Sequence, residues 1–382
     1  MAIFGDALEE VNRVGVSCII TLQNLFPGCD ELFHAITELG NSAHSFSLLV
    51  PLAAALDLQL SCDLLVVCLV GEWLNILMKW TFMEGRPYWW VKETDIYETY
   101  GITAPVIQQT SHTCETGAGS PSGHCMHAAV VGFVLAKWII AKYESRSRFP
   151  RPNAPYYRRF IWSVYAVILL LIGLSRMYIA AHFPHQCVLG AAIGIPLAWA
   201  LTSENSSLCR WWKNSGRAHL MFAASAIATL SCAAYWLQRA LGVDPQWSVK
   251  LAFKWCQSHR NLHVSTTNVF ALVRVCGSAF GFAIACPYSK RLVNKRLSIP
   301  FGMLLALLLN VAVRSVQKSI PTANVYTFYS AHFFLHAGLP LLVLLYFPKP
   351  NTNNPERSAS SLSSSSDANR RASPRETRAK YD

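Results

Sequence analysis

The sequence predicts an all-α, polytopic membrane protein with about nine transmembrane helices. Of its 382 residues, 52% are hydrophobic and only 14% are charged, whereas soluble domains carry roughly 25% charged residues. Apolar runs of roughly 20 residues, long enough to cross a bilayer as a helix, recur along most of the chain. The 33 Lys and Arg residues outnumber the 21 Asp and Glu residues. Because they gather in short loops and in the tail, they indicate cytosolic loops of a membrane protein rather than a nucleic-acid-binding surface.

The apolar runs place the elements in order along three regions. Residues 1–29 are expected to be a polar or interfacial lead-in, and they lack the pattern of a cleaved signal peptide. Residues 30–346 form the membrane domain. Residues 347–382 are rich in Ser and Arg with almost no large apolar residue, which predicts a disordered cytosolic tail. The nine spans are expected at 30–55, 58–82, 122–143, 160–180, 186–202, 218–240, 265–287, 299–317 and 322–346.

Basic residues in three loops predict the orientation in the membrane. The loops after the third, fifth and seventh spans lie on one side if the spans alternate, and Lys and Arg side chains are favoured on the cytosolic side. An odd number of spans then places the N-terminus in the lumen. The glycosylation sequon at Asn205 would be cytosolic and unused. The basic residues are Arg146, Arg148, Arg151, Arg158 and Arg159, then Arg210, Lys213 and Arg217, then Lys290, Arg291, Lys295 and Arg296.

Three short polar segments stand at the ends of spans. They are residues 79–87 (KWTFMEGRP), 121–124 (PSGH) and 175–182 (SRMYIAAH). Strict alternation of the spans places all three at the same, non-cytosolic membrane face. Charged residues at the edge of a membrane are costly and are therefore candidates for a functional site. Together the segments supply three cations, two histidines and a Gly-Ser turn, which suits a pocket for a phosphoryl group.

The first segment offers two cations of different kinds. Arg86 lies between Gly85 and Pro87, which predicts that the helix ends there and that Arg86 is held in a turn. Its planar guanidinium can donate two parallel hydrogen bonds to phosphate, and Lys79 would add a point charge from seven residues earlier, on the same helix face.

The other two segments offer backbone donors and histidines. Free N–H groups near Ser122 and Gly123 at the start of a helix would form an anion site, with His124 beside it. Arg176 and His182 are six residues apart and would point about 120° apart on a continuous helix. To converge, the chain must leave helical geometry between them.

The three motifs K-x6-RP, PSGH and SR-x5-H, in this order, resemble the type 2 phosphatidic acid phosphatase superfamily. Longer strings resemble the glucose-6-phosphatase catalytic subunits within it, and the resemblance covers roughly residues 30–346. GEWLN, PSGHCM and LAFKWC lie closer to the glucose-6-phosphatase 3 type than to the liver type. The strings are GEWLNILMKW (71–80), RPYWW (86–90), CETGAGSPSGHCM (114–126), LSRMYIAAHFPHQ (174–186) and LAFKWC (251–256).

The resemblance implies the superfamily's helical core and hydrolysis of glucose 6-phosphate through a phosphohistidine, at the lumenal face of the endoplasmic reticulum. His182 would be the nucleophile, and His124 would protonate the leaving oxygen and then activate water. Lys79, Arg86 and Arg176 would bind the phosphoryl oxygens, with backbone groups near Ser122 and Gly123. No metal or other cofactor is implied. The expected partners are glucose 6-phosphate, membrane lipid and a separate glucose-6-phosphate transporter, without nucleic acid.

One departure from the superfamily leaves the orientation of His182 open. The superfamily has an Asp four residues after the nucleophile, whereas this chain has Gln186, as the glucose-6-phosphatases do. Two other functions remain: a lipid phosphate phosphatase with the same pocket, and a non-catalytic protein that binds or transports a phosphate sugar. The second is disfavoured because binding alone would need the cations but not the pair of histidines.

Other ionisable residues have several possible roles. Glu38, Asp63 and Glu72 could hold sugar hydroxyls, and an ion pair between Glu72 and Lys79 is the simplest expectation. The loop 89–119, which contains Glu115, could face a sugar or the membrane interface. Most of the 12 cysteines are expected to be small buried apolar residues, and no CxxC pair indicates zinc.

Overall fold

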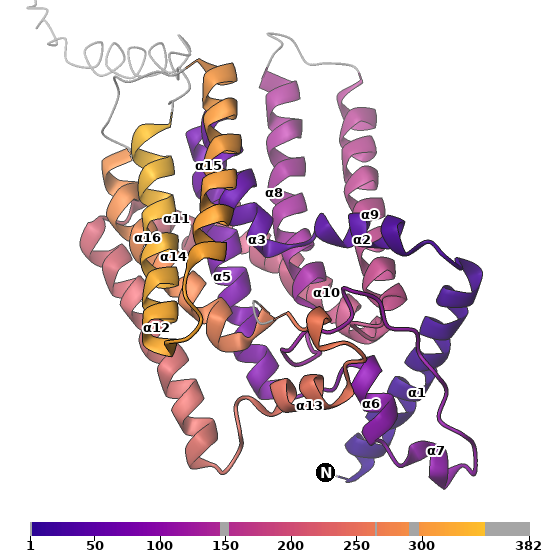
Figure 1. Ribbon diagram of the computed structural model, residues 1–382. Coiled ribbons are helices and arrows are strands. Elements are labelled where there is room, and N and C mark those ends of the chain that lie inside the picture. Colours follow the sequence, from indigo (N-terminus) through magenta and orange to yellow (C-terminus); the bar gives the residue numbers. More distant parts are fainter. Residues whose placement is uncertain (1, 146–152, 264–265, 290–297, 348–382) are drawn as a thin grey trace, which may run out of the picture.

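The computed structural model describes residues 2–145, 153–263, 266–289 and 298–347, and within these ranges the fold is helical with no strand (Figure 1). The predicted tail lies outside the described residues except for Phe347, as do the basic residues at 146–151 and 290–296. The helices are α1 (Ala2–Leu25), α2 (Asp30–Glu38), α3 (Ser42–His44), η1 (Ser45–Leu49), α4 (Val50–Leu56), α5 (Leu58–Phe82), α6 (Pro87–Glu93), α7 (Ile96–Thr99), α8 (Gly123–Ser145), α9 (Ala154–Tyr178), α10 (Pro184–Thr202), α11 (Ser207–Asn214), α12 (Arg217–Ala240), α13 (Trp247–Trp255), η2 (His259–Asn261), α14 (Asn268–Ser289), α15 (Ile299–Ser319) and α16 (Val325–Tyr346).

The described helices agree with a membrane protein of about nine spans. Eight are long and apolar enough to cross a bilayer. A ninth candidate, the broken span, consists of the segments Asp30–Glu38 and Ser42–Leu56, which meet at 47° and pass the same length and composition test only when they are taken together. The break follows from local chemistry, because the side chain of Asn41 accepts a hydrogen bond from the N–H of Ala43 (3.0 Å) and so begins a new helix.

Within the expected lead-in, residues 2–25 form the 24-residue helix α1, which was not predicted. One face of α1 buries Val16 and Ile19, which belong to an apolar cluster with Phe183 at the start of α10. The opposite face leaves Val11 and Val14 exposed. The polar residues scattered along this segment hide its helical period, so the sequence alone did not reveal a helix that packs beside the site.

The spans divide into central and peripheral helices. The most apolar stretches of α5 and α14 are 67% and 72% buried, whereas those of α9, α12 and α15 are only 17% buried. The first two helices therefore form the centre of the bundle, and the other three present apolar side chains outward, as a lipid-facing helix does.

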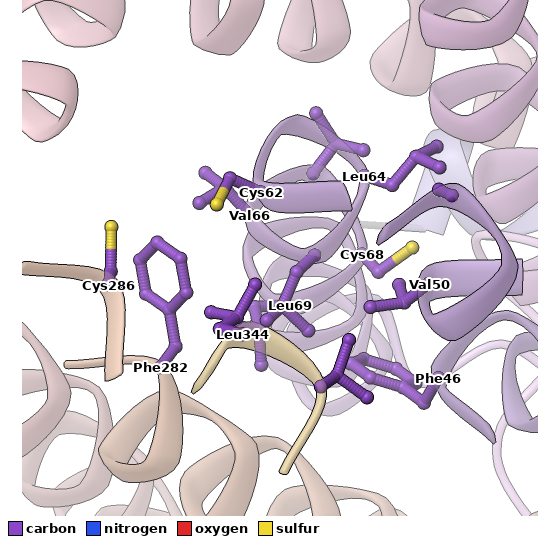
Figure 2. Close-up of a cluster of buried hydrophobic side chains, with 14 of the residues drawn as sticks. Phe46, Val50, Cys62, Leu64, Val66, Cys68, Leu69, Phe282, Cys286 and Leu344 are labelled. Carbon is purple, nitrogen blue, oxygen red and sulfur yellow. The ribbon is translucent and has the colours of Figure 1, made fainter. Parts of the chain in front are cut away.

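The central cluster lies where α5 meets α14, α16 and the broken span (Figure 2). Figure 2 shows Leu69 of α5 facing Phe282 of α14 and Leu344 of α16. The backbones of α14 and α16 approach closely at Gly281. A Cβ atom at this position would lie only 2.1 Å from the carbonyl oxygen of Ala337. Small residues permit such close backbone contact in membrane bundles.

Short helices gather at one end of the bundle. Figure 1 shows α6, α7 and α13 at the lower end, together with the end of α5, while α8 and α16 finish at the upper end. A disulfide between Cys114 and Cys256 joins the loop before α8 to the end of α13 at this lower end. The bond was not predicted, because most of the cysteines were expected to be buried apolar residues and a separation of 142 residues gives no recognisable spacing.

Candidate active site

The first polar segment places Arg86 in a turn, as predicted. Helix α5 ends at Phe82, Met83 adopts a left-handed conformation (φ 52°), and α6 begins at Pro87. The buried Lys79 occupies the last turn of α5, one element earlier than Arg86. The two cations therefore do not share a continuous helix, but the turn brings Arg86 back towards the bundle.

Arg86 is fully buried and is held by main-chain carbonyl groups. Its Nε donates to the oxygen of Gly117 (2.6 Å), Nη2 donates to that of Ala118 (3.2 Å), and Nη1 donates to that of Ala181 (2.9 Å). Nη1 also lies 3.2 Å from Nε2 of His182. The guanidinium is therefore fixed by the backbone of two different loops and directed at the histidine of the third polar segment.

The third segment leaves helical geometry between its arginine and its histidine, as their spacing required. Helix α9 ends at Tyr178, Ala180 has φ 55°, and α10 begins at Pro184. The N–H of His182 donates to the carbonyl oxygen of Arg176 (3.2 Å) across this turn. The side chains of Arg176 and His182 consequently face the same point instead of lying 120° apart.

Two oxygen atoms orient the ring of His182. Its Nδ1 lies 2.8 Å from the carbonyl oxygen of Gly119 and 3.3 Å from Oε1 of Gln186. Since both partners only accept hydrogen bonds, Nδ1 carries the proton. Nε2 then keeps its lone pair, which fits its position beside the donor Nη1 of Arg86. The group that orients His182, which the sequence left open, is therefore chiefly a backbone carbonyl.

The amide of Gln186 is itself fixed in one orientation. Its Nε2 donates to Oε2 of Glu84 (3.1 Å) and to the carbonyl oxygen of Gly85 (3.0 Å), while its Oε1 accepts the N–H of Phe183 (3.2 Å). The carbonyl of Gly119 can approach because that residue lacks a side chain: a Cβ there would lie 2.3 Å from the oxygen of Gly85. An Asp at position 186 would not provide these two donors.

The environment of His182 keeps its imidazole neutral. Burial, followed by the positive charges of Arg86 and Arg176, holds the pKa of His182 well below its usual value. A neutral ring with an unprotonated Nε2 is the form that can act as a nucleophile.

The second segment forms a tight turn before α8. The side-chain amide of Asn75 donates to the carbonyl oxygen of Pro121 (3.1 Å), and the N–H of Ser122 donates to that of Gln186 (3.0 Å). The Oγ of Ser122 accepts the N–H of Cys125 (3.4 Å). Ser122, which the sequence placed among the phosphate-binding residues, thus uses these groups to hold the turn. The helix start at Gly123 remains the candidate backbone donor.

Glu115 joins the three segments, a role that was not predicted from the sequence. Its Oε2 lies 2.9 Å from Nη1 of Arg86 and its Oε1 lies 2.5 Å from Nη2 of Arg176. Nδ1 of His124 and Nε2 of His182 are 3.6 and 3.9 Å from the carboxylate. Burial opposes its ionisation, but the charges of Arg176 and Arg86 outweigh this effect and hold the pKa of Glu115 well below its usual value. The carboxylate is therefore ionised at neutral pH.

A cavity of about 210 Å³ leads away from this cluster. Lys79, Glu115, His124 and Arg176 line one part of it. The remainder is lined largely by polar side chains, including Glu38, Asn41, Ser42, Glu72, Asn268 and Arg274.

Two of the acidic residues singled out from the sequence have partners that were not expected. Glu72 forms a buried ion pair with Arg274 of α14, and this overturns the expected pair with Lys79. Asp63 lies 3.4 Å from Nζ of Lys213, and it does not line the cavity found in the described part of the chain.

Comparisons with known proteins agree with this geometry. The PAP2 superfamily matches residues 60–206, a stretch that contains all three polar segments. The chain is 31% identical to human glucose-6-phosphatase 2 over 351 residues, which cover 89% of this chain and 96% of that protein. It is 33% identical to mouse glucose-6-phosphatase 3 over 281 residues (73% and 76%) and 30% identical to cat glucose-6-phosphatase catalytic subunit 1 over 278 residues (73% and 76%). No solved structure gives a significant match.

Proposed function

Because the chain belongs to the glucose-6-phosphatase family, we propose that it hydrolyses glucose 6-phosphate to glucose and phosphate through a phosphohistidine on His182. One observation carries this proposal: two arginines and two histidines from three separate segments surround a single point, and the unprotonated Nε2 of His182 is directed at it. Binding of a phosphate sugar without chemistry would not need a histidine in this orientation.

The proposed reaction has two displacements at phosphorus. Nε2 of His182 attacks the phosphorus, the bond to the sugar oxygen breaks, and His124 gives that oxygen a proton. His124 then takes a proton from water, which attacks the phosphohistidine and releases phosphate. Arg86 and Arg176 stabilise the charge on the phosphoryl oxygens, assisted by Lys79 and the N–H of Gly123, since phosphoryl transfer depends mainly on positioning and charge. Ser122 acts by holding the turn.

The polar part of the cavity favours a sugar over a lipid as the esterified group. Ser42, Glu72, Asn268 and Arg274 line it with donors and acceptors for hydroxyl groups. A diacylglycerol would require an apolar surface in the same place.

Two features support a lumenal active site in the endoplasmic reticulum membrane. The Cys114–Cys256 disulfide stands beside the site, and disulfides persist in oxidising compartments. The basic residue Arg158 lies in the first turns of α9, and Figure 1 shows the start of α9 at the upper end of the bundle, away from α6 and α13. The positive-inside rule assigns a basic end to the cytosol. In this orientation the N-terminus is lumenal, the tail 347–382 is cytosolic, and a glucose-6-phosphate transporter would supply the substrate.

The test uses the full chain purified in detergent. We expect it to release phosphate from glucose 6-phosphate in the presence of a chelator and to act poorly on phosphatidate in mixed micelles. His182→Ala should abolish turnover, and His124→Ala should reduce it by about two to four orders of magnitude. His219→Ala, an exposed position on α12, is the matched control. Full activity of His182→Ala, or a preference for phosphatidate, would contradict the proposal.

A further inference from the structure

The carboxylate of Glu115 stands where the phosphoryl group of a substrate has to bind. It lies 2.9 Å from Arg86, 2.5 Å from Arg176, 3.6 Å from His124 and 3.9 Å from His182. The proposed mechanism assigns Arg86, Arg176 and His182 to the phosphoryl group and His124 to the oxygen that leaves it. We infer that Glu115 is an internal anion that occupies the phosphoryl position of the empty site, and that substrate binds by displacing it. This inference rests on the proposed function.

Glu115 also separates the nucleophile from the cavity. Arg86 and His182 are fully buried (0% exposed). The cavity is lined by Glu115 and Arg176, whereas Arg86 and His182 are not among the described residues that line it. Attack on phosphorus requires an approach of about 3–3.5 Å to Nε2 of His182. A carboxylate oxygen already stands 3.9 Å from this atom, so the two groups cannot occupy the position together.

The displacement can be limited to the side chain, because the backbone of Glu115 is held on several sides. Its N–H donates to the oxygen of Thr113 (2.9 Å), and its carbonyl oxygen accepts the hydroxyl of Tyr88 (3.0 Å). It pairs with His263 as an isolated bridge, and the preceding Cys114 is in the disulfide. The side chain borders the cavity of about 210 Å³, which offers room for it to turn.

Such an internal anion makes the site selective for strongly charged ligands. A displacing group must interact with Arg86 and Arg176 better than a carboxylate that is already in place. A phosphate monoester dianion brings two negative charges and three oxygens, whereas a carboxylate or a phosphodiester brings one charge. Glu115 would also fill the site again when product phosphate leaves, and would therefore limit inhibition by product.

Glu115→Gln tests the inference, because it keeps the size of the side chain and removes the charge. The probes are inorganic phosphate and vanadate, measured as inhibitors of hydrolysis and by the shift in Tm. We expect the inhibition constant for phosphate to fall by about tenfold to a hundredfold, the range of a hydrogen-bonded charge. Glu93→Gln, in an exposed pair with Lys254, should behave like the wild type.

The stability of Glu115→Gln gives a second measurement. Without an anion, Arg86 and Arg176 would be buried without a counter-charge, so the variant should have a lower Tm than the wild type. Phosphate or vanadate should restore it, with a larger rise than in the wild type. A variant that is recovered folded only in phosphate supports the inference. A variant that stays unfolded in saturating phosphate contradicts it, because the added anion should replace the lost one.

The outcomes separate this inference from the proposed function. An unchanged or higher inhibition constant in Glu115→Gln would mean that Glu115 only positions the arginines, and it would overturn the displacement while leaving the hydrolysis intact. If neither phosphate nor vanadate bound to the wild type or to the variant, the phosphoryl site itself would be wrong, and the inference would fail with it.

Discussion

Replacing Gln186 by Leu would distinguish the contribution of Gln186 from that of the Gly119 carbonyl in holding the ring of His182. The side chain of Gln186 makes four polar contacts, at 3.3 Å to Nδ1 of His182, 3.2 Å to the N–H of Phe183, 3.1 Å to Glu84 and 3.0 Å to the carbonyl of Gly85. Leucine makes none of them. The N–H of Phe183 and the carbonyl of Gly85 each lose this contact inside the protein, although the Nδ1 of His182 keeps its shorter bond to Gly119.

The expected losses of stability and of kcat follow from the contacts that are lost and the one that is kept. Two orphaned backbone groups cost about 1–3 kcal/mol each, so the variant should be destabilised by about 2–6 kcal/mol. The remaining contact to the oxygen of Gly119, at 2.8 Å, should preserve the proton on Nδ1. Loss of one weaker hydrogen bond then predicts that the folded fraction loses only about tenfold in kcat.

The assay compares Tm and the kcat for glucose 6-phosphate hydrolysis in detergent. Gln59→Leu is a matched control, because Gln59 contacts Asp63 far from the site. A variant at position 186 with an unchanged Tm and a kcat reduced by a thousandfold or more would refute the reasoning. It would show that Gln186, and not Gly119, orients the nucleophile.

Three further predictions concern the same region. Gly119→Ala places a Cβ 2.3 Å from the oxygen of Gly85, so the loop must shift. We expect the variant to lose about 1–3 kcal/mol of stability, seen as a lower Tm, and to have a reduced kcat. Arg274→Met leaves the carboxylate of Glu72 buried without its partner and should cost about 3–5 kcal/mol, whereas the double variant with Glu72→Gln should recover most of the Tm. The third prediction concerns pH. His182 is neutral when folded and has its usual pKa of about 6.5 when unfolded, so the unfolded state binds more protons and stability falls as the pH drops below about 6.5. Between pH 7.5 and 5.5 the free energy of unfolding of His182→Gln should therefore fall by up to about 1.4 kcal/mol less than that of the wild type, and its Tm should fall less as well.

Bilayer physics made much of the fold predictable from the sequence. A span needs a fixed length of apolar residues, so the ends of the helices, and with them the three polar segments, could be placed before any contact was known. The same regularity explains why α1 was missed, since its polar residues remove the apolar run on which the spans were recognised. The broken first span could be located but its angle could not, because that angle follows from the local cap at Asn41.

The unpredicted parts of the site come from loops. Glu115, the carbonyl of Gly119 and the Cys114–Cys256 bond all lie in or end at irregular segments, where no period links a residue to its neighbours in space. The predicted partner of Glu72 was wrong for a related reason. Helix spacing pointed to Lys79 on the same face of α5, whereas the neighbouring helix α14 supplies Arg274. A single sequence does not reveal which helices become neighbours.

The main-chain acceptor at Gly119 has a consequence for engineering. In a hydrolase whose histidine donates a hydrogen bond to a side-chain carboxylate, the basicity of the ring can be changed by substituting that side chain. Here the acceptor is a main-chain carbonyl group, which every residue has, so no substitution can replace it by a different chemical group. A saturation mutagenesis map would record position 119 as intolerant through lack of space, and it would assign the residue no chemistry. Retuning His182 would require rerouting the loop itself.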